Sequence, residues 1–492
     1  MPVLTMSRVP VIKSKSIGSK HSQLIDEEEN LCGIELNGLY KKITKKISRF
    51  SKKARKRLQK WKAGEKTKRK RRGTTAFVVS WILIYIIIQT CKLLSSTDYL
   101  VCLAKLNRTL IRPHNVHSWQ SIHDRRRDVL LYSAHYRPLG DSRAVHILAV
   151  GTGIPQELIC LLWYADSFFP DVIKATTLNH DVDEVKKGRI VEQFFFTCAC
   201  NSTQPPIYVS LTGPRCSVPT TFLQVQVPQK EEPVKEFGIC MSSTNVNVHP
   251  YHIIEWMEAH QMFGIDEITL YYHTFSSNMS RVLNQYQKDG FVRLNYVSVP
   301  RRYGFWSDFK IISSLSLNDC MWKNMYRYHY IFILLNFDEI VIPRIHNNYS
   351  ALLDYVDRTE GLVVPATSYL FQNTVFNLCA ADTKDPAFSN FLRYLKRDPP
   401  SEEMRDFRSL VNPRYCLSLF THYCHSFVSV EAMPWTVKVH QHVALTHHYH
   451  NVNKKKVNCD NMKKNLAVDR TVDRFRKPLS KRCENRIMQH KL

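Results

Sequence analysis

Residues 73–91 form a strongly apolar stretch that contains no charged residue. A helix of this length spans roughly 28 Å at about 1.5 Å per residue, close to the thickness of a bilayer's hydrocarbon core. The stretch begins too far from the N-terminus for a cleaved signal peptide, and no small-residue cleavage pattern follows it. No face of the helix would be polar, which argues against the alternative of a buried core helix. The pattern therefore predicts a transmembrane anchor, placed at residues 75–91.

After the anchor, the hydrophobic pattern becomes short and β-like. Residues 92–125 are predicted to form a stem, and residues 126–235 a β-rich subdomain in which Pro and Gly break short apolar runs. Four of these runs are at residues 129–136, 144–150, 206–211 and 222–227. We interpret Gly151 and Gly153 as part of a turn, because a phosphate-binding loop would need a third glycine and a following helix.

From residue 236 the pattern alternates between strands and helices. Strands are expected at residues 237–240, 265–272, 291–299 and 330–335, and helices at residues 252–263, 279–289 and 309–328. The alternation predicts an α/β domain at residues 236–455 with a mostly parallel, buried sheet flanked by helices. Ligands bind such sheets beyond the carboxyl ends of the strands, which draws attention to the residues after Leu335. Residues 456–492 are expected to be a basic C-terminal tail.

The distribution of charge gives the chain an orientation. The chain has 492 residues and a net charge of +26, and residues 1–74 contain 22 Lys and Arg against 6 Asp and Glu. We expect this basic segment to be disordered, and on its own it is typical of a nuclear-localisation or nucleic-acid-binding patch. Because it lies directly before the anchor, the positive-inside rule predicts a cytoplasmic tail and a lumenal C-terminal portion. We expect a single-pass type II membrane protein whose tail contacts anionic lipid and which has no nucleic-acid partner.

Two features beyond the anchor agree with a lumenal location. Four Asn-x-Ser/Thr glycosylation acceptors follow the anchor, at Asn107, Asn201, Asn278 and Asn348. Twelve cysteines also follow it and could form up to six disulfides in an oxidising compartment. Their spacings match no zinc framework, since Cys198 and Cys200 are one residue too close for a zinc knuckle.

Candidate chemistry lies in residues 336–343, directly after the strand expected at residues 330–335. Asp338 and Glu339 place two carboxylates at the end of this strand, which suits a hard cation such as Mg²⁺ or Mn²⁺. A cation there would bridge a diphosphate and neutralise the charge that develops as the diphosphate leaves. The alternative is that the acidic pair caps a helix or lies in a surface turn.

Several blocks of the sequence are similar to those of one known enzyme family. The blocks are residues 132–136, 255–264, 317–320, 336–343, 411–413 and 444–449, together with His422. The family's blocks read Tyr-Ser-Ala-x-Tyr, Glu-Trp-Ile-Glu-x-His…Leu-Gly, Leu-Asn-Asp-Cys, Asp-x-Asp-Glu-Phe-Ile-Val-Pro, Val-x-Pro and Ala-Leu-x-His-His-Tyr. Because the blocks occur in the same order, the chain resembles glycosyltransferase family 92 over residues 129–450.

The resemblance implies a GT-A-type fold and transfer of a sugar from a nucleotide-sugar to a glycan of a glycoprotein or glycolipid. UDP-galactose is the donor that the resemblance implies, and Mn²⁺ is the usual metal. The type II topology, which we derived without the family, is the one that a Golgi glycosyltransferase needs. We therefore predict an inverting, metal-dependent β-galactosyltransferase in the Golgi membrane with its catalytic domain in the lumen.

Carried over to this sequence, the resemblance assigns Asp338 as a metal ligand that also binds the donor. Asn336 occupies the first acidic position of the family's Asp-x-Asp element, where it keeps an oxygen ligand but removes a charge and should weaken the site. Glu339 is expected to act in catalysis by orienting the site as a second carboxylate. His447 or His448 would complete the metal site, with His422 as a less favoured choice. The alternative is that this histidine-rich tract is packed or solvated and binds no metal.

Inverting transfer also needs a carboxylate base close to the acceptor hydroxyl. Five carboxylates remain open as candidates: Asp382, Asp385, Glu402, Glu403 and Asp406. Two other functions fit parts of the sequence. Asn336 is compatible with a non-catalytic relative that binds glycans or scaffolds other enzymes. The basic residues 41–72 are compatible with a membrane-tethered binder of nucleic acid or polyphosphoinositides, although this function leaves the lumenal residues without a role.

Overall fold

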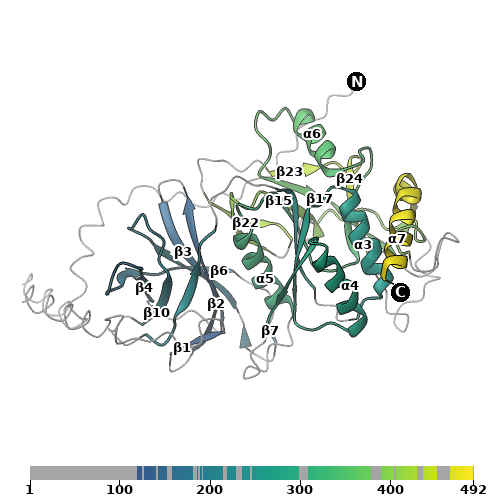
Figure 1. Ribbon diagram of the computed structural model, residues 1–492. Helices are drawn as coiled ribbons and strands as arrows, with labels where there is room; N and C mark the ends of the chain where they lie inside the picture. The colour runs from purple at the N-terminus through teal and green to yellow at the C-terminus, as the bar shows by residue number, and fades with distance from the viewer. Residues whose placement is uncertain are drawn as a thin grey trace, which may run out of the picture. The chain divides into compact units, whose positions relative to one another are not determined.

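The structure is a computed structural model that describes part of the chain (Figure 1). The described residues are 119–124, 127–139, 142–151, 158–180, 185–186, 189–190, 192–213, 219–228, 235–243, 247–298, 309–377, 389–403, 406–420, 422–428, 436–450 and 466–490. All of them belong to one compact unit, Leu106–Leu492. The predicted tail, the anchor at residues 75–91 and most of the predicted stem lie outside them. Within the described residues, no helix is both long and apolar enough to cross a membrane.

The first part of the described chain is β-rich, as its short alternating runs predict. A nine-stranded sheet has the order β5-β4-β10-β11-β2-β3-β9-β6, with β1 paired to β2. Its strands are β1 (Gln120–Asp124), β2 (Arg127–Leu139), β3 (Ser142–Gly151), β4 (Ile159–Trp163), β5 (Asp171–Lys174), β6 (Thr176–His180), β9 (Glu192–Ala199), β10 (Tyr208–Thr212) and β11 (Leu223–Gln226), and β7 (Val185–Lys186) pairs separately with β8 (Arg189–Ile190). Successive side chains alternate between two cores: Val129 and Leu131 lie in one, Leu130 in the other.

The second part confirms the predicted mixed α/β fold. A seven-stranded sheet has the order β14-β13-β12-β15-β20-β17-β23. Its strands are β12 (Lys235–Ser242), β13 (Glu267–Tyr272), β14 (Val292–Tyr296), β15 (Tyr328–Leu334), β17 (Ser368–Phe371), β20 (Arg408–Val411) and β23 (Thr436–Val439). The four strands from β14 to β15 in this order are parallel, whereas β20 runs antiparallel to both of its neighbours. The helices are α3 (Pro250–Met262), α4 (Ser277–Lys288), α5 (Phe309–Lys323) and α6 (Tyr349–Thr359).

A smaller, five-stranded sheet receives the chain after β15. Its order is β16-β24-β18-β19-β25, formed by β16 (Glu339–Pro343), β24 (Ala444–His450), β18 (Asn373–Asn377), β19 (Lys396–Arg397) and β25 (Ala467–Val468). A separate hairpin consists of β21 (Cys416–Leu419) and β22 (Cys424–Phe427). The pairing of β16 with β24 brings residues around 340 and 447 together, which positions the site described below.

The C-terminal segment differs from the basic tail expected at residues 456–492. It contains the 3₁₀ helix η5 (Thr471–Phe475) and the helix α7 (Arg476–His490), which stands against α3 in Figure 1. The Phe475 and Leu479 side chains are buried in the same hydrophobic core as α3. Arg482 and Arg486 form ion pairs with Glu258 of α3 at 3.1 and 2.9 Å. Part of the positive charge therefore neutralises a buried carboxylate, which a count of basic residues does not reveal.

Cysteines in the described residues form three disulfides, Cys160–Cys198, Cys240–Cys320 and Cys416–Cys424. Two further described cysteines, Cys200 and Cys483, are free and buried. Disulfide bonding among the described cysteines agrees with the prediction, and the other four cysteines after the anchor, Cys102, Cys216, Cys379 and Cys459, lie outside the described residues.

The predicted glycosylation acceptors are exposed where the structure describes them. Asn201, Asn278 and Asn348 all lie at the surface, and Asn107 lies outside the described residues. Asn348 also accepts a hydrogen bond from the Ala351 backbone N–H through its side-chain oxygen, which caps α6. Glycosylation at these positions remains a prediction.

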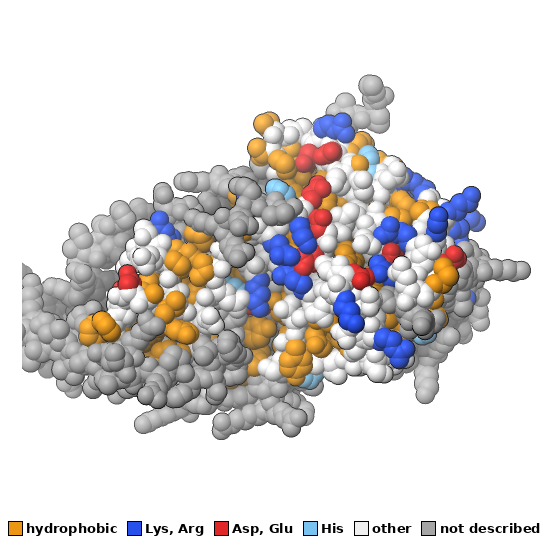
Figure 2. All heavy atoms as spheres, viewed as in Figure 1, with side chains coloured by type: hydrophobic (Ala, Val, Ile, Leu, Met, Phe, Trp, Pro, Cys, Tyr) orange, Lys and Arg blue, Asp and Glu red, His pale blue; other side chains and the backbone are white. Residues whose placement is uncertain are grey.

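Charged side chains of both signs share the described surface. On the face drawn in Figure 2, Lys and Arg side chains lie next to Asp and Glu side chains over the α/β part of the chain. Nucleic-acid-binding domains instead gather basic side chains on one face or along one helix. Among the coloured residues of this view, no such uniformly basic surface is visible.

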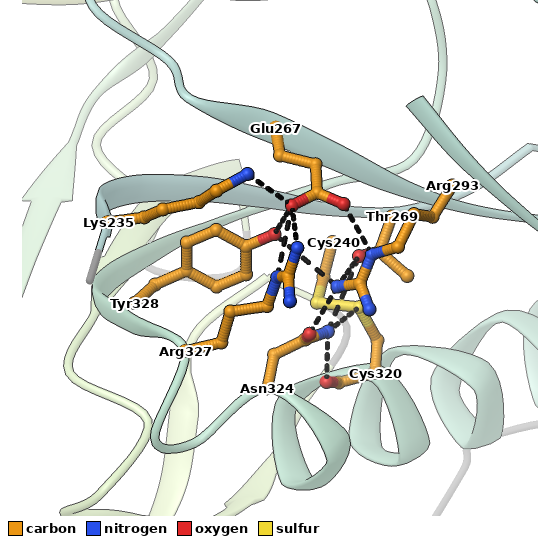
Figure 3. Close-up of polar contacts among 9 residues, drawn as sticks. All are labelled: Lys235, Cys240, Glu267, Thr269, Arg293, Cys320, Asn324, Arg327 and Tyr328. Atoms are coloured by element: carbon orange, nitrogen blue, oxygen red, sulfur yellow. Dashed lines mark hydrogen bonds and ion pairs between the residues drawn. A yellow bond between two sulfur atoms is a disulfide. The ribbon is translucent and has the colours of Figure 1, made fainter. Parts of the chain in front are cut away.

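At the amino ends of the parallel strands, three cations surround one buried carboxylate (Figure 3). The side chain of Glu267 is 3% exposed and forms ion pairs with Lys235, Arg293 and Arg327, each at 2.6 Å. The Tyr328 hydroxyl donates to the same carboxylate at 3.0 Å. Burial alone would raise the pKa of Glu267, but hydrogen bonds from Lys235 and Arg327 bring it below its ordinary value. This Glu267 cluster ties the beginnings of β12, β13, β14 and β15 together.

Candidate metal centre

Two contacts from α3 fix the segment that follows β15. Phe337 is buried with its ring centroid 5.3 Å from that of Trp256. Trp256 Nε1 donates a hydrogen bond to the Glu339 carbonyl oxygen at 2.7 Å. The residue between these two contacts, Asp338, is therefore held just beyond the carboxyl end of β15. Open α/β sheets bind ligands at this edge.

Three side chains with metal-binding atoms meet at this point. Asp338, Glu339 and His448 each place one ligand atom within 4.8 Å of the others. Glu339 and His448 are directly opposite each other in the antiparallel pair of β16 and β24, so their side chains lie on the same face. His448 Nε2 is 3.6 Å from Asp338 Oδ2, and His448 Nδ1 is 3.9 Å from Glu339 Oε1. We call these three residues the candidate metal centre.

Asp338 has unused capacity to bind a ligand. Its side chain is 33% exposed, but its Oδ1 atom is buried and has no hydrogen-bond partner among the described residues. A buried polar atom in this state is rare in folded proteins, because it has lost its contact with water without compensation. A divalent cation would compensate it. The mixed oxygen and nitrogen donors fit a transition-metal ion such as Mn²⁺ better than Ca²⁺, which takes oxygen ligands.

Glu339 is held by Arg408 of β20. Arg408 Nε donates to Glu339 Oε2 at 2.9 Å, and Arg408 Nη2 donates to Oε1 at 2.5 Å. Burial alone would raise the pKa of Glu339, but the charge of Arg408 and its hydrogen bonds lower it to about 2. Glu339 is therefore ionised at neutral pH, and its two oxygens are already occupied. Glu339 is therefore better placed to orient the His448 ring than to bind a cation directly.

The protonation of His448 is controlled by its acidic neighbours. Burial alone would lower the pKa of His448, but the hydrogen bond to Asp338 and the charge of Glu339 raise it above its ordinary value. His422 behaves in the opposite way, because burial and the charge of Arg408 lower its pKa to about 3. His422 is thus neutral at physiological pH, with Arg408, Glu339 and His448 as its charged neighbours.

The structure separates the two adjacent histidines. His447 faces the opposite side of β24, where it is fully buried and stacks on Phe376 with the ring centroids 4.4 Å apart. Its Nδ1 atom is 3.2 Å from the Tyr449 hydroxyl. Burial lowers the pKa of His447 to about 3. Of the two residues expected near Asp338, the structure brings His448 there and places His447 in the core.

Comparison with known families identifies the part of the chain that contains this centre. The sequence profile of the family described as "Glycosyltransferase family 92" matches residues 235–487, which is more than half of the chain. The chain belongs to glycosyltransferase family 92. The family's match includes β12 to β24 and most of α7, so the C-terminal helix is part of the same domain as the candidate metal centre. The chain is therefore a glycosyltransferase by family.

Solved structures resemble smaller parts of this family 92 member. "S. aureus TarS 1-349" is 7% identical over 36% of this chain and 47% of its own, with a TM-score of 0.21. A putative glucose-1-phosphate thymidylyltransferase from Bacillus anthracis is 10% identical over 36% of this chain and 72% of its own, with a TM-score of 0.21. The WbbM bifunctional glycosyltransferase is 14% identical over 30% of this chain and 27% of its own, with a TM-score of 0.17. No curated protein matches the chain. The family assignment rests on the profile, because scores this low carry no argument.

The candidate bases of the family 92 domain differ in their surroundings. Glu402 and Glu403 are exposed. Asp406 is partly buried, and its carbonyl oxygen accepts a hydrogen bond from Arg408 Nη1 at 2.9 Å. Asp382 and Asp385 lie outside the described residues. Among the described candidates, Asp406 is the one linked through Arg408 to the metal centre.

Sequence reasoning missed two residues that hold the centre. Trp256 lies in a block that resembles the family, but its contact with the Glu339 backbone was not expected. Arg408 had a detectable signal, because a charged residue inside the apolar run 407–411 needs a buried partner of opposite charge. Its partner is 69 residues away in sequence, so the pattern alone does not name it.

Proposed function

We propose that this glycosyltransferase moves galactose from UDP-galactose to a glycan acceptor, with inversion and with the help of a bound divalent cation. The proposal is supported chiefly by Asp338 Oδ1, which is buried beside His448 and lacks a hydrogen-bond partner in the described part of the chain. A purely structural ion pair would use both oxygens, as Arg408 does with Glu339. The position of Asp338 after the central strand β15 is where a nucleotide-sugar would bind.

Each residue of the centre has its own part in the proposal. Asp338 and His448 would hold the cation, which we propose is Mn²⁺. Asn336 would offer its amide oxygen to the donor's ribose or to a water molecule. Glu339, held by Arg408, fixes the orientation of the His448 ring. When bound, such a cation would neutralise the charge that develops on the departing diphosphate.

The base of the proposed inverting reaction is Asp406. Inversion requires a carboxylate that accepts the proton of the acceptor hydroxyl from a distance of about 3 Å. The hydrogen bond from Arg408 to the Asp406 carbonyl oxygen keeps this residue near the centre, and its carboxylate accepts a hydrogen bond from the Ser401 hydroxyl at 2.6 Å. Glu402 and Glu403 are exposed. Asp406→Asn should lower kcat and leave the affinity for UDP unchanged.

A donor screen tests the proposed activity. The purified full-length protein is incubated with each common UDP-sugar and a glycan acceptor, with and without Mn²⁺. We expect sugar transfer from UDP-galactose that stops on chelation and returns when Mn²⁺ is added back. Transfer from a different UDP-sugar would correct the donor, and transfer that survives chelation would remove the cation from the proposal.

Asn336 favours a second candidate function, that of a non-catalytic relative. At the position where the family blocks have a carboxylate, an amide contributes no charge and holds a cation less firmly. A protein of this kind would bind a glycan but release no UDP from any donor. Glycan binding together with a complete absence of turnover in the donor screen would favour this candidate over the enzyme.

We also propose that the glycosyltransferase is anchored in the Golgi membrane with its N-terminus in the cytoplasm. The apolar stretch at residues 75–91, the basic segment before it and the exposed glycosylation acceptors after it support this topology. Protease added to intact microsomes should remove only the residues before the anchor. Digestion of the family 92 domain under these conditions would contradict the topology.

A further inference from the structure

Four aromatic side chains gather where β13 and β14 end. Tyr272 and Phe275 stack with their ring centroids 4.5 Å apart and their planes within 10°. Tyr296 meets Tyr272 edge-on at 5.8 Å and stacks with His273 at 6.0 Å. We call Tyr272, His273, Phe275 and Tyr296 the aromatic platform.

Tyr296 and His273 of the platform are open to solvent, whereas Tyr272 and Phe275 are partly buried. Tyr271 is 1% exposed and packs into the core, whereas the Tyr296 side chain is 61% exposed and His273 is also exposed. Tyr296 and His273 are therefore an exposed pair of stacked rings, and a flat ligand can stack on rings that are open to solvent. Exposed aromatic side chains at a ligand-binding edge are more informative than single apolar residues elsewhere on a surface.

The platform also lies at a suitable distance from the candidate metal centre. In the sheet order, β13 and β14 are the second and third strands from β15, which leads into Asp338. At about 4.8 Å between neighbouring strands, the platform lies roughly 10–14 Å to the side of the centre along the same edge. The order of the strands reverses between these two positions, at β12, where ligands of open α/β sheets bind. A nucleoside diphosphate is long enough to connect the two.

His273 adds a preference among flat ligands. Its Nδ1 atom is 3.1 Å from the Val297 carbonyl oxygen, which only accepts hydrogen bonds. Nδ1 therefore carries the proton, and Nε2 of the neutral ring is an acceptor. An acceptor at the rim of the platform suits a base with a ring N–H, such as uracil. Cytosine presents a lone pair at the equivalent ring nitrogen, so it fits this rim less well.

We propose that the aromatic platform stacks on the uracil of the donor nucleotide, with Tyr296 as its main surface and His273 as the residue that selects the base. The inference rests on the proposed function, because it takes the donor to be a nucleotide-sugar whose diphosphate reaches Asp338. It goes further in assigning the other end of the donor to named residues on β13 and β14.

Titration calorimetry with UDP and the full-length protein in detergent tests the platform. Loss of one base–aromatic stack weakens binding by about 5- to 150-fold, so Tyr296→Ala should raise the Kd for UDP by such a factor. Tyr296→Phe keeps the ring, so its Kd for UDP should stay within about threefold of that of the unchanged protein, a smaller change than the loss of a stack would cause. His273→Phe keeps a ring but removes the acceptor, and it should reduce the preference for UDP over CDP by about tenfold.

The outcomes separate the platform from the proposed activity. Unchanged affinity of Tyr296→Ala for UDP, in a protein that still transfers sugar, would overturn the platform alone. A raised KM for the glycan acceptor with an unchanged Kd for UDP would also overturn it, because the platform would then bind acceptor sugar. Failure of the unchanged protein to bind any nucleotide would overturn both proposals.

Discussion

The two ends of one parallel sheet treat a carboxylate in opposite ways. At the amino ends, Glu267 is almost fully buried and is surrounded by Lys235, Arg293 and Arg327. At the carboxyl end of β15, Asp338 is partly exposed, and its Oδ2 atom is 3.6 Å from Nε2 of His448. The first carboxylate has more cationic partners than it needs. The second has one oxygen that no described residue satisfies.

This difference indicates which carboxylate serves the fold and which is kept for a ligand. Placing three cations around Glu267 compensates for its burial and joins four strands, so its contribution is to stability. The buried Asp338 Oδ1 atom without a hydrogen-bond partner lowers the stability of the fold, and such a cost is typical of ligand-binding and catalytic sites. Charge alone does not distinguish the two, since both residues are acidic and both lie where the parallel strands begin or end. The two carboxylates differ in how many hydrogen-bond and ion-pair partners each one has.

The largest effect is expected from Asp338→Ala. Removal of this carboxylate should lower kcat/KM for sugar transfer by about 100- to 1000-fold, because the cation that neutralises the leaving diphosphate is poorly held. The melting temperature should change little, because the Asp338 side chain is 33% exposed and His448 keeps Glu339 as a second acidic neighbour. Steady-state kinetics and thermal unfolding of the same preparation measure both quantities. Full activity of the variant would end the assignment of Asp338 to the metal.

Glu267→Gln should show the reverse behaviour. Breaking a buried ion pair typically costs 3–5 kcal/mol, and we expect about 3 kcal/mol here because the three cations are still 28–43% exposed. The specific activity of the folded fraction should be retained. Glu402→Gln is the matched control, because its side chain is 82% exposed and its pairing with Lys438 should be worth less than about 1 kcal/mol. Equal stability of the two variants in denaturant titrations would show that the Glu267 cluster contributes nothing special.

His448 and His447 provide a matched pair for the next effect. Loss of a residue that only supports a metal ligand typically weakens metal binding by about 10- to 100-fold. Because His448 is proposed as a ligand itself, His448→Ala should weaken Mn²⁺ binding by at least this factor. His447→Phe should leave Mn²⁺ binding unchanged, because this ring faces Phe376 in the core. Isothermal titration with Mn²⁺ compares the two. Equal losses in both variants would contradict the separation of the histidines by β24.

The pH dependence of Mn²⁺ binding follows from the raised pKa of His448. A cation needs the neutral ring, so affinity should fall as the pH drops through a value above 6.5, the ordinary histidine pKa. Without a cation the sign is reversed: the charged ring beside two carboxylates stabilises the fold fully below about pH 6.5, and this contribution is lost as the pH rises through the folded-state pKa. Mn²⁺ titrations from about pH 5.5 to about pH 8, a range that includes the ordinary histidine pKa, test the expected fall in affinity. Loss of affinity only well below 6.5 would argue against it.

The smallest effect is expected from Asn336→Asp. The new carboxylate would add a negative charge close to the bound cation, and Mn²⁺ binding should tighten by less than about tenfold, the size of a partly exposed charge pair. Activity should rise by a similar or smaller factor. A clear loss of activity would show that the amide of Asn336 has a role of its own toward the donor.

Much of the α/β fold was predictable because its elements carry their own periodicity. The helix expected at residues 279–289 is α4, Ser277–Lys288, which the Ser276 hydroxyl caps at its start. The strand expected at residues 330–335 is β15, Tyr328–Leu334. The helix expected at residues 309–328 ends earlier, at Lys323, since the Asn324 side chain bonds back to the Cys320 carbonyl oxygen and Arg327 pairs with Glu267.

The candidate site was only half predictable, since its remaining features depend on contacts between distant residues. Asp338 could be found because it follows an apolar strand directly. The choice between His447 and His448 could not be made, because it depends on which face of β24 meets β16. Arg408 and Glu339 are 69 residues apart, and a local pattern does not reveal such a pair.

The docking of α7 on α3 has a consequence for the fate of shortened chains. A chain cut at residue 455, where the sequence pattern suggests a boundary, would lose Phe475 and Leu479 from the core and both arginine partners of Glu258. Every residue of the metal centre would still be present in it. Exposed apolar surface and an uncompensated buried acid are features that chaperones and proteases act on. We therefore expect nonsense mutations near the end of the chain to reduce the amount of protein in the cell, and not the chemistry of the molecules that survive.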